Sequence, residues 1–93
     1  FDNIIEYAQM GLVPAGAYSN QEYLKDNVSF DASIEDSMID ILFDPQTSGG
    51  LLISVPEDQA TDLLIELYSL GVDQANIIGE VVASNNQPRI KVE

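Results

Sequence analysis

A short apolar run followed at once by an amphipathic stretch constrains the fold most strongly. Residues 51–55 are almost wholly apolar and lie between a glycine and Pro56, which is typical of a buried strand. Residues 57–70 then place apolar side chains at helical spacing, and Gly71 provides a stop. The proline and the two acidic residues after it suit the first turn of a helix. We therefore predict a strand over 51–55 and a helix over 57–70.

The same kinds of signal predict the other elements. In chain order we expect a helix over 1–10 that ends at Gly11, an irregular connection over 12–27, a short strand over 28–30, a helix with Ser33 as its N-cap that ends at Asp44 and Pro45, and a closing hairpin of 75–83 and 89–92 joined by a turn at 84–88. This order predicts an α+β fold, a layered sandwich of helices on a mainly antiparallel sheet.

Length and charge limit the classes of function. The 93 residues are 45% hydrophobic and fit a single folded domain over 1–93. Sixteen acidic residues face only Lys25, Arg89 and Lys91, which gives a net charge of −13. Because nucleic-acid binding depends on cations that neutralise phosphates, we expect no nucleic-acid partner. The same balance argues against the chain holding a nucleoside triphosphate unless metal ions or a second domain supply positive charge.

Several further classes are excluded by what the sequence lacks. Without cysteine or histidine there is no disulfide, no thiolate zinc site, no cysteine nucleophile and no histidine general base. No apolar run has the roughly 18 to 20 residues that a membrane span needs, so we expect a cytoplasmic protein with no membrane partner. The chain begins at Phe1 rather than at methionine, and we expect it to be part of a longer protein.

The polar loop between the last two predicted helices is the densest chemical feature. Residues 44–50 read DPQTSGG, with two hydroxyls at Thr47 and Ser48 and two flexible residues at Gly49 and Gly50. Successive backbone N–H groups in such a turn can bind an anion. The loop lacks the lysine and the following helix of a nucleotide phosphate loop. The alternative is purely structural: Asp44 and Pro45 end a helix, and the glycines begin a strand.

A second pattern is an acidic repeat in the predicted third helix. Asp36, Asp40 and Asp44 are spaced four apart, as a magnesium-binding stripe would be. They lie opposite the apolar face of that helix, so we interpret them as a solvated face and predict no metal site in this chain.

The polar loop also carries a family resemblance. LFDPQTSGGLLISVP, residues 42–56, resembles the signature of the selenophosphate synthetase (selenide, water dikinase) family near the start of its C-terminal domain. Upstream, GLVPAGAYSNQEY is similar to a loop of proline, glycine and asparagine around a tyrosine in that family, although Ala17 and Ser19 stand where many members have threonine and arginine. The similarity extends through the helix at 57–70 and the GEV segment at 79–81.

This resemblance implies a two-domain enzyme that makes selenophosphate, AMP and phosphate from selenide, ATP and water with Mg²⁺. The chain would be its C-terminal lid domain, with the fold of the aminoimidazole ribonucleotide synthetase C-terminal domain. The implied partners are the N-terminal domain of the same chain, which carries the catalytic and ATP-binding residues, and a second copy in a homodimer. We then expect no catalytic residue here and neither ATP nor Mg²⁺ bound by this fragment alone, with Asn20, Thr47, Ser48, Gly49 and Gly50 lining a substrate cleft or only shaping the interdomain surface.

Two alternatives stay open at this stage. The chain is also compatible with the equivalent domain of a related ATP-dependent enzyme, such as thiamine monophosphate kinase or the hydrogenase-maturation dehydratase. It is also compatible with a stand-alone acidic interaction module. A different sequence is expected at the DPQTSGG turn in the related enzymes, and that string favours the selenophosphate synthetase reading.

Overall fold

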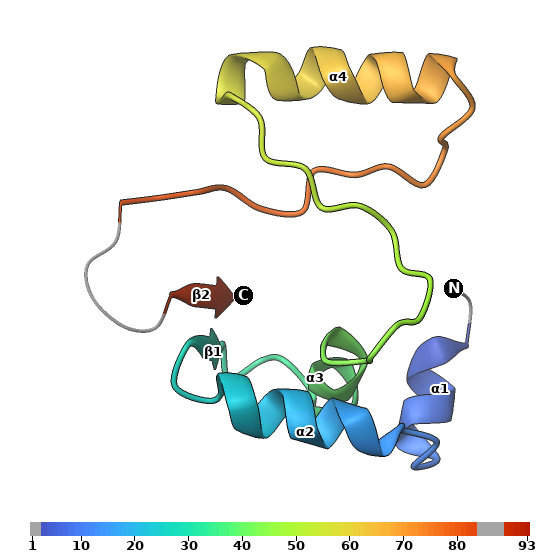
Figure 1. Ribbon diagram of the computed structural model, residues 1–93, viewed down its shortest axis with the longest axis vertical. Coiled ribbons are helices and arrows are strands. Elements are labelled where there is room, and N and C mark those ends of the chain that lie inside the picture. Colours follow the sequence, from blue (N-terminus) through green and yellow to red (C-terminus); the bar gives the residue numbers. More distant parts are fainter. Residues whose placement is uncertain (1–2, 84–88) are drawn as a thin grey trace. The chain divides into compact units, whose positions relative to one another are not determined.

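The computed structural model describes residues 3–83 and 89–93, which form two compact units (Figure 1). The first unit contains the chain up to Ser48 together with the C-terminal residues 89–93. The second unit is Gly49–Ala83. Within the described ranges, no helix combines the length and the apolar character that crossing a membrane requires.

Helices α1 and α3 of the first unit pack against each other (Figure 1). Helix α1 spans Ile4–Gln9, and Gly11 follows it with a φ of 77°, a left-handed conformation that glycine adopts at little cost. Helix α3 spans Asp36–Leu42 and ends directly before Phe43. The predicted helix at the start of the chain and its glycine stop are confirmed.

Helix α2 spans Ala15–Leu24, where the sequence predicted an irregular connection, and that prediction was wrong. Pro14 precedes the helix in an extended conformation, so it begins the helix rather than interrupting it. Ala17 is completely buried on the inner face. The apolar pattern is weak because Asn20 and Gln21 lie near it and make polar contacts with α3 and the residue after it.

Strands β1, Val28–Phe30, and β2, Ile90–Val92, form a parallel two-stranded sheet with Val28 opposite Ile90. The backbone carbonyl of Asn27 accepts hydrogen bonds from the amides of residues 89 and 90 where the pairing begins. The predicted strand at 28–30 is confirmed. The predicted hairpin is wrong because β2 pairs with β1 instead of with 75–83; its turn at 84–88 lies outside the described residues.

The turn between β1 and α3 is closed by Asp31. Its carboxylate accepts hydrogen bonds from the Ser33 backbone N–H, at 2.9 Å, and from the Ser33 hydroxyl, at 2.7 Å. Ser33 was predicted to cap the next helix, but Glu35 occupies the N-cap position. The prediction failed because an aspartate two residues earlier competes for the same serine in a local Asx turn.

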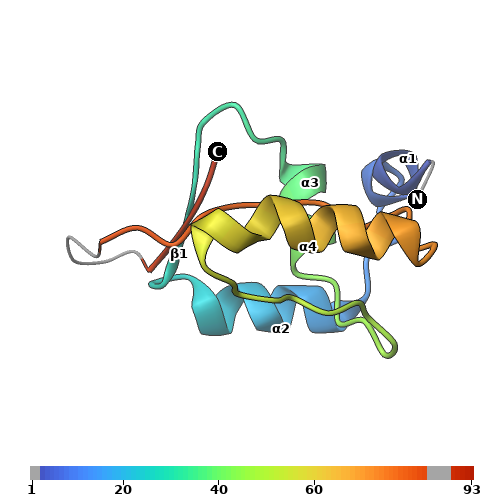
Figure 2. The ribbon, with the colours of Figure 1, turned by 90° about the horizontal axis from the view of Figure 1, so that it is seen from above.

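The core of the first unit is small and centres on Phe43, whose exposed fraction is 9%. Its ring meets that of Phe30 edge to face, with 5.9 Å between the ring centroids. Helix α3, which Phe43 follows, also contacts both α1 and α2 (Figure 2). Phe43 therefore joins the end of α3 to the strand pair.

The second unit is organised by helix α4, Glu57–Ser69 (Figure 1). Glu57 and Asp58 occupy its first turn, and Gly71 follows it with a φ of 84°, as the sequence predicted. The chain then turns back on the helix: the Val72 amide donates to the Leu67 carbonyl, and the Tyr68 hydroxyl donates to the Ala75 carbonyl at 2.9 Å. The predicted helix and both of its end signals are confirmed.

The predicted strands of the second unit are not formed. Residues 51–55 and 75–83 have no strand conformation, and the side chains of Leu51 and Val81 are 90% and 92% exposed. A strand needs a hydrogen-bonding neighbour, and neither segment has one within the described chain. The prediction of a buried strand at 51–55 was therefore wrong for this structure, although the apolar character that motivated it is real.

The helices and the small sheet together make an α+β fold. The one sheet among the described residues is parallel, so the layered arrangement on a mainly antiparallel sheet stays a prediction.

Replacement of Phe43 by alanine is expected to lower the free energy of unfolding of the first unit by about 3 kcal/mol, because a buried aromatic side chain leaves a cavity. Chemical denaturation followed by circular dichroism measures this change. Leu51→Ala is the control, since its side chain is exposed and its removal should change stability by less than about 0.5 kcal/mol. Equal effects of the two substitutions would contradict the assigned core.

The hydrogen bonds from Ser33, first from its backbone N–H and then from its hydroxyl, and the charge of Lys91 hold the pKa of Asp31 below its ordinary value of 3.8. A lowered folded-state pKa means that this turn stabilises the fold at pH values above 3.8 and loses that contribution as the pH falls through the folded value. In a carboxyl NMR titration, Ser33→Ala should raise the Asp31 midpoint part of the way towards 3.8, because the backbone N–H remains. Ser69→Ala should leave it unchanged; a midpoint insensitive to Ser33→Ala would contradict the assignment.

Candidate functional site

The loop at 44–48 leaves the end of α3 in a tight, locally bonded path. The Asp44 amide donates to the Ile41 carbonyl at 3.1 Å, and the Gln46 amide donates to the Asp44 carbonyl at 2.9 Å. Pro45 cannot continue the helix, which ends at Leu42. Thr47 and Ser48 then form an exposed turn. Both residues are therefore accessible to a ligand.

Helix α2 contacts the beginning of this loop at two points. The Asn20 side-chain amide donates a 2.9 Å hydrogen bond to the carbonyl of Phe43. Gly16, one turn earlier, lies against the ring of Pro45, so closely that a Cβ atom on Gly16 would be 2.8 Å from Pro45 Cγ. The structure thus brings Asn20 to the backbone of Phe43, the residue directly before the predicted loop.

The acidic repeat is not a uniform solvated face. Asp40 is half-buried and accepts a 2.7 Å hydrogen bond from the Gln21 side chain on α2. Asp44 is also half-buried at the end of α3, whereas Asp36 is exposed. Among residues 3–83 and 89–93, no three acidic side chains come together as a metal site would require.

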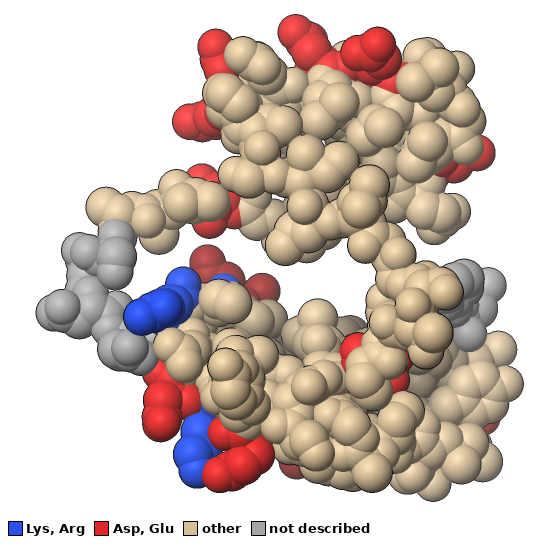
Figure 3. Space-filling model, viewed as in Figure 1, with Lys and Arg blue, Asp and Glu red and all other residues tan. Residues whose placement is uncertain are grey.

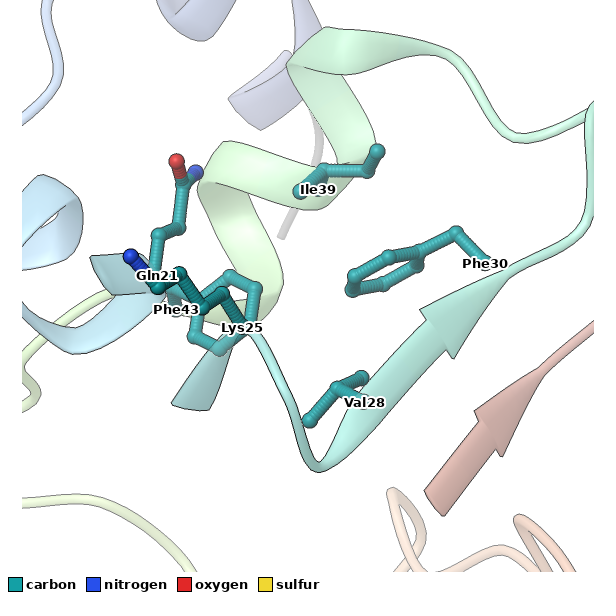
Figure 4. Close-up of a pocket in the computed structure, with 6 residues that line it drawn as sticks. All are labelled: Gln21, Lys25, Val28, Phe30, Ile39 and Phe43. Carbon is teal, nitrogen blue, oxygen red and sulfur yellow. The ribbon is translucent and has the colours of Figure 1, made fainter. Parts of the chain in front are cut away.

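A shallow pocket of about 220 Å³ lies in the first unit, with Phe43 in its lining (Figure 4). Its lining comes from α2 and the residue after it, from β1, and from α3 and the residue after it: Gln21, Lys25, Val28, Phe30, Ile39 and Phe43. The pocket is smaller than the roughly 300–1,000 Å³ of typical ligand sites. Its one cation, Lys25, is paired with Glu22. Neither its size nor its charge suits a nucleoside triphosphate.

The two glycines of the predicted site belong to the second unit. A Cβ atom added at Gly50 would meet nothing within 4 Å, and the left-handed glycines are Gly11 and Gly71. Among residues 3–83 and 89–93, therefore, nothing gives a steric reason for a glycine at position 50. Asn20, Thr47 and Ser48 belong to the first unit.

Charge is distributed unevenly between the two units. Lys25, Arg89 and Lys91 all belong to the first unit, and the second unit has acidic side chains but no basic one. Figure 3 shows the acidic side chains over α4. Lys91 is paired with Glu93, which raises the pKa of the lysine, so Lys25 and Lys91 both have an acidic neighbour within the chain.

Comparison with known proteins identifies the class to which this sequence belongs. The chain is 44% identical over 87 residues to a selenide, water dikinase of Clostridium botulinum (strain Eklund 17B), 49% over 81 residues to that of Clostridioides difficile (strain 630), and 51% over 76 residues to that of Caldanaerobacter subterraneus. These alignments cover 94%, 87% and 82% of this chain but only 25%, 23% and 22% of the relatives. No family model and no solved structure matches the sequence.

The chain is therefore homologous to a segment of a larger enzyme, and it spans about a quarter of the length of the curated relatives it matches. That enzyme family is the selenide, water dikinases, and the resemblance predicted from residues 42–56 is confirmed. An alignment that covers 94% of the chain takes in both the DPQTSGG loop and α2.

Sequence reasoning found the loop but missed two residues of α2: Gly16, which contacts the loop at Pro45, and Gln21, which binds Asp40 on α3. Gly16 was interpreted only as a sign of irregular structure, and Gln21 was not singled out. The signal that could have found them is the spacing of Gly16, Asn20 and Gln21, which places all three on one side of a helix once residues 15–24 are read as helical.

Proposed function

We propose that this chain is the C-terminal domain of a selenide, water dikinase, which makes selenophosphate, AMP and phosphate from selenide, ATP and water. The observation that carries the proposal is the 44% identity to such an enzyme over 94% of the chain. The N-terminal domain of the same protein is then its main partner. We further propose that the whole enzyme is cytoplasmic and homodimeric.

ATP and Mg²⁺ would be held by other parts of that enzyme. The described residues fit neither group, because they contain no cluster of acidic ligands, and the pocket beside α2 offers one cation already paired with Glu22. The absence of cysteine and histidine from the sequence also leaves this chain without a cysteine nucleophile and without a histidine general base. No chemical step is therefore assigned to this segment by itself.

The proposed contribution of this chain is a set of neutral hydrogen-bond donors for substrate anions. Thr47 and Ser48 are exposed on a turn, and their hydroxyls and N–H groups can bind oxyanions without a positive charge. Gly49 and Gly50 extend the segment with backbone groups that no side chain covers. Asn20 is proposed to belong to the same site, although its side-chain nitrogen is already bonded to Phe43.

The exposed apolar segments suggest what the rest of the enzyme provides. Residues 51–55 and 75–83 have strand-like sequences but no strand partner among the described residues. We expect both to become strands in the whole enzyme, which would complete the layered sandwich on a mainly antiparallel sheet. The aminoimidazole ribonucleotide synthetase C-terminal domain is the fold to which this proposal corresponds.

Alanine at Thr47 or Ser48 in the longer enzyme should lower kcat/KM for selenide-dependent ATP turnover by about tenfold or more. The reason is that a hydrogen bond to a charged group contributes roughly 1.5–3 kcal/mol. Coupled measurement of AMP and phosphate release tests this. Thr61→Ala on α4 is the matched control and should retain full activity, since Thr61 is exposed outside the loop. Unchanged turnover in both loop variants would contradict the proposed role of Thr47 and Ser48 in substrate binding.

A further inference from the structure

Two residues of α2 hold the first residues of the loop from one side. Gly16 and Asn20 are four apart in the helix, so they lie on the same face, one turn from each other. Gly16 meets the ring of Pro45, and Asn20 meets the carbonyl of Phe43. The two contacts thus flank the Asp44 backbone.

Gly16 has a steric reason for lacking a side chain. Glycine within a helix costs roughly 0.5–1 kcal/mol relative to alanine, so its presence in the first turn of α2 needs an explanation. Its φ is not left-handed, but an added Cβ would lie 2.8 Å from Pro45 Cγ and 3.3 Å from Pro45 Cβ. The proline ring is bonded to its own backbone nitrogen and cannot rotate away, so a side chain at position 16 must displace either Pro45 or α2.

Asn20 supplies a partner for a carbonyl at a helix end. Phe43 is the C-cap residue of α3, where carbonyl groups lose their partners within the helix. The 2.9 Å hydrogen bond from Asn20 satisfies this carbonyl and fixes the plane of the peptide that joins Phe43 to Asp44. The ring of the same residue, Phe43, is buried.

The geometry points to Gly16 and Asn20 as positioning residues that set where Thr47 and Ser48 stand. Phe43 and Pro45 are held by α2, and Thr47 follows Pro45 by only two residues, so a displacement at Pro45 is passed on to the turn. This role deepens the proposed function and rests on it for its catalytic consequence. The contacts themselves do not depend on that function.

The first test measures the position of the loop, using the longer enzyme labelled with ¹⁵N-threonine. Asn20→Ala and Gly16→Ala should each shift the Thr47 amide resonance and leave that of Thr61 on α4 unmoved. Asn76→Ala is the matched control: it removes another asparagine whose side chain donates to a backbone carbonyl, that of Gln74 at 3.2 Å. It should leave Thr47 unmoved. An unmoved Thr47 resonance in the Asn20 and Gly16 variants would overturn the proposal.

The second test measures coupling between Gly16 and Pro45 in turnover. Gly16→Ala should lower kcat by roughly 3- to 30-fold, and adding Pro45→Ala should recover at least about threefold of that loss, because the second change removes the ring that the new methyl group meets. KM for ATP should change by less than about twofold, since Gly16 and Asn20 position the loop and do not bind the nucleotide. Losses that simply multiply in the double variant would overturn the proposal.

The two tests distinguish two outcomes: that Gly16 and Asn20 do not position the loop, and that the proposed enzymatic function is wrong. If the unsubstituted enzyme shows no selenide-dependent turnover, the proposed function fails, and the Thr47 resonance still decides whether Gly16 and Asn20 position the loop. If turnover is present and neither variant alters the resonance or kcat, the proposed function stands and the positioning role of Gly16 and Asn20 is wrong. An unchanged kcat in Asn20→Gln would also count against the positioning role of Asn20, because the longer side chain should displace the amide from the Phe43 carbonyl.

Discussion

The first unit depends on how Phe43 is held at the end of α3. Its ring is buried and packs edge to face on Phe30, which ties α3 to the strand pair. Its carbonyl accepts the Asn20 side chain, which ties the same residue to α2. Because the DPQTSGG loop begins at the next residue, the direction in which that loop leaves the fold follows from these two contacts. Phe43 therefore joins the core of the first unit to the start of the exposed loop.

Segments whose signals are local could be predicted from the sequence. Helix α4 follows from Pro56, its apolar spacing and Gly71, and all of these act within the segment itself. Helix α2 was missed because its inner face carries Asn20 and Gln21, whose partners are on α3 and directly after it and cannot be seen in a local pattern. Strands depend on distant partners, so residues 51–55 and 75–83 read as strands although no described neighbour pairs with them. The candidate loop was found from its residues, but its attachment to Gly16 required the structure.

The proposal that this chain is one domain of a larger enzyme agrees with its charge and with its exposed apolar side chains. The net charge of −13 and the pairing of Lys25 and Lys91 with acidic neighbours leave little positive charge for phosphates. The second unit exposes Leu51, Leu52 and Val81, which a separate folded domain would ordinarily cover. The curated relatives are about four times as long as this chain's matched segment. These observations agree with a domain that contributes donors and surface while another part of the protein holds the nucleotide.

Complementation of a truncated enzyme tests most directly whether this chain and the rest of the protein are both needed for activity. The longer protein, the same protein without these 93 residues, and the truncated protein supplemented with the separate chain would be assayed for selenophosphate formation by ³¹P NMR with selenide and magnesium-ATP. The account predicts product from the longer protein, none from the truncated protein or the chain alone, and product again when the two are combined. Full activity in the truncated protein, or product from the chain alone, would contradict it.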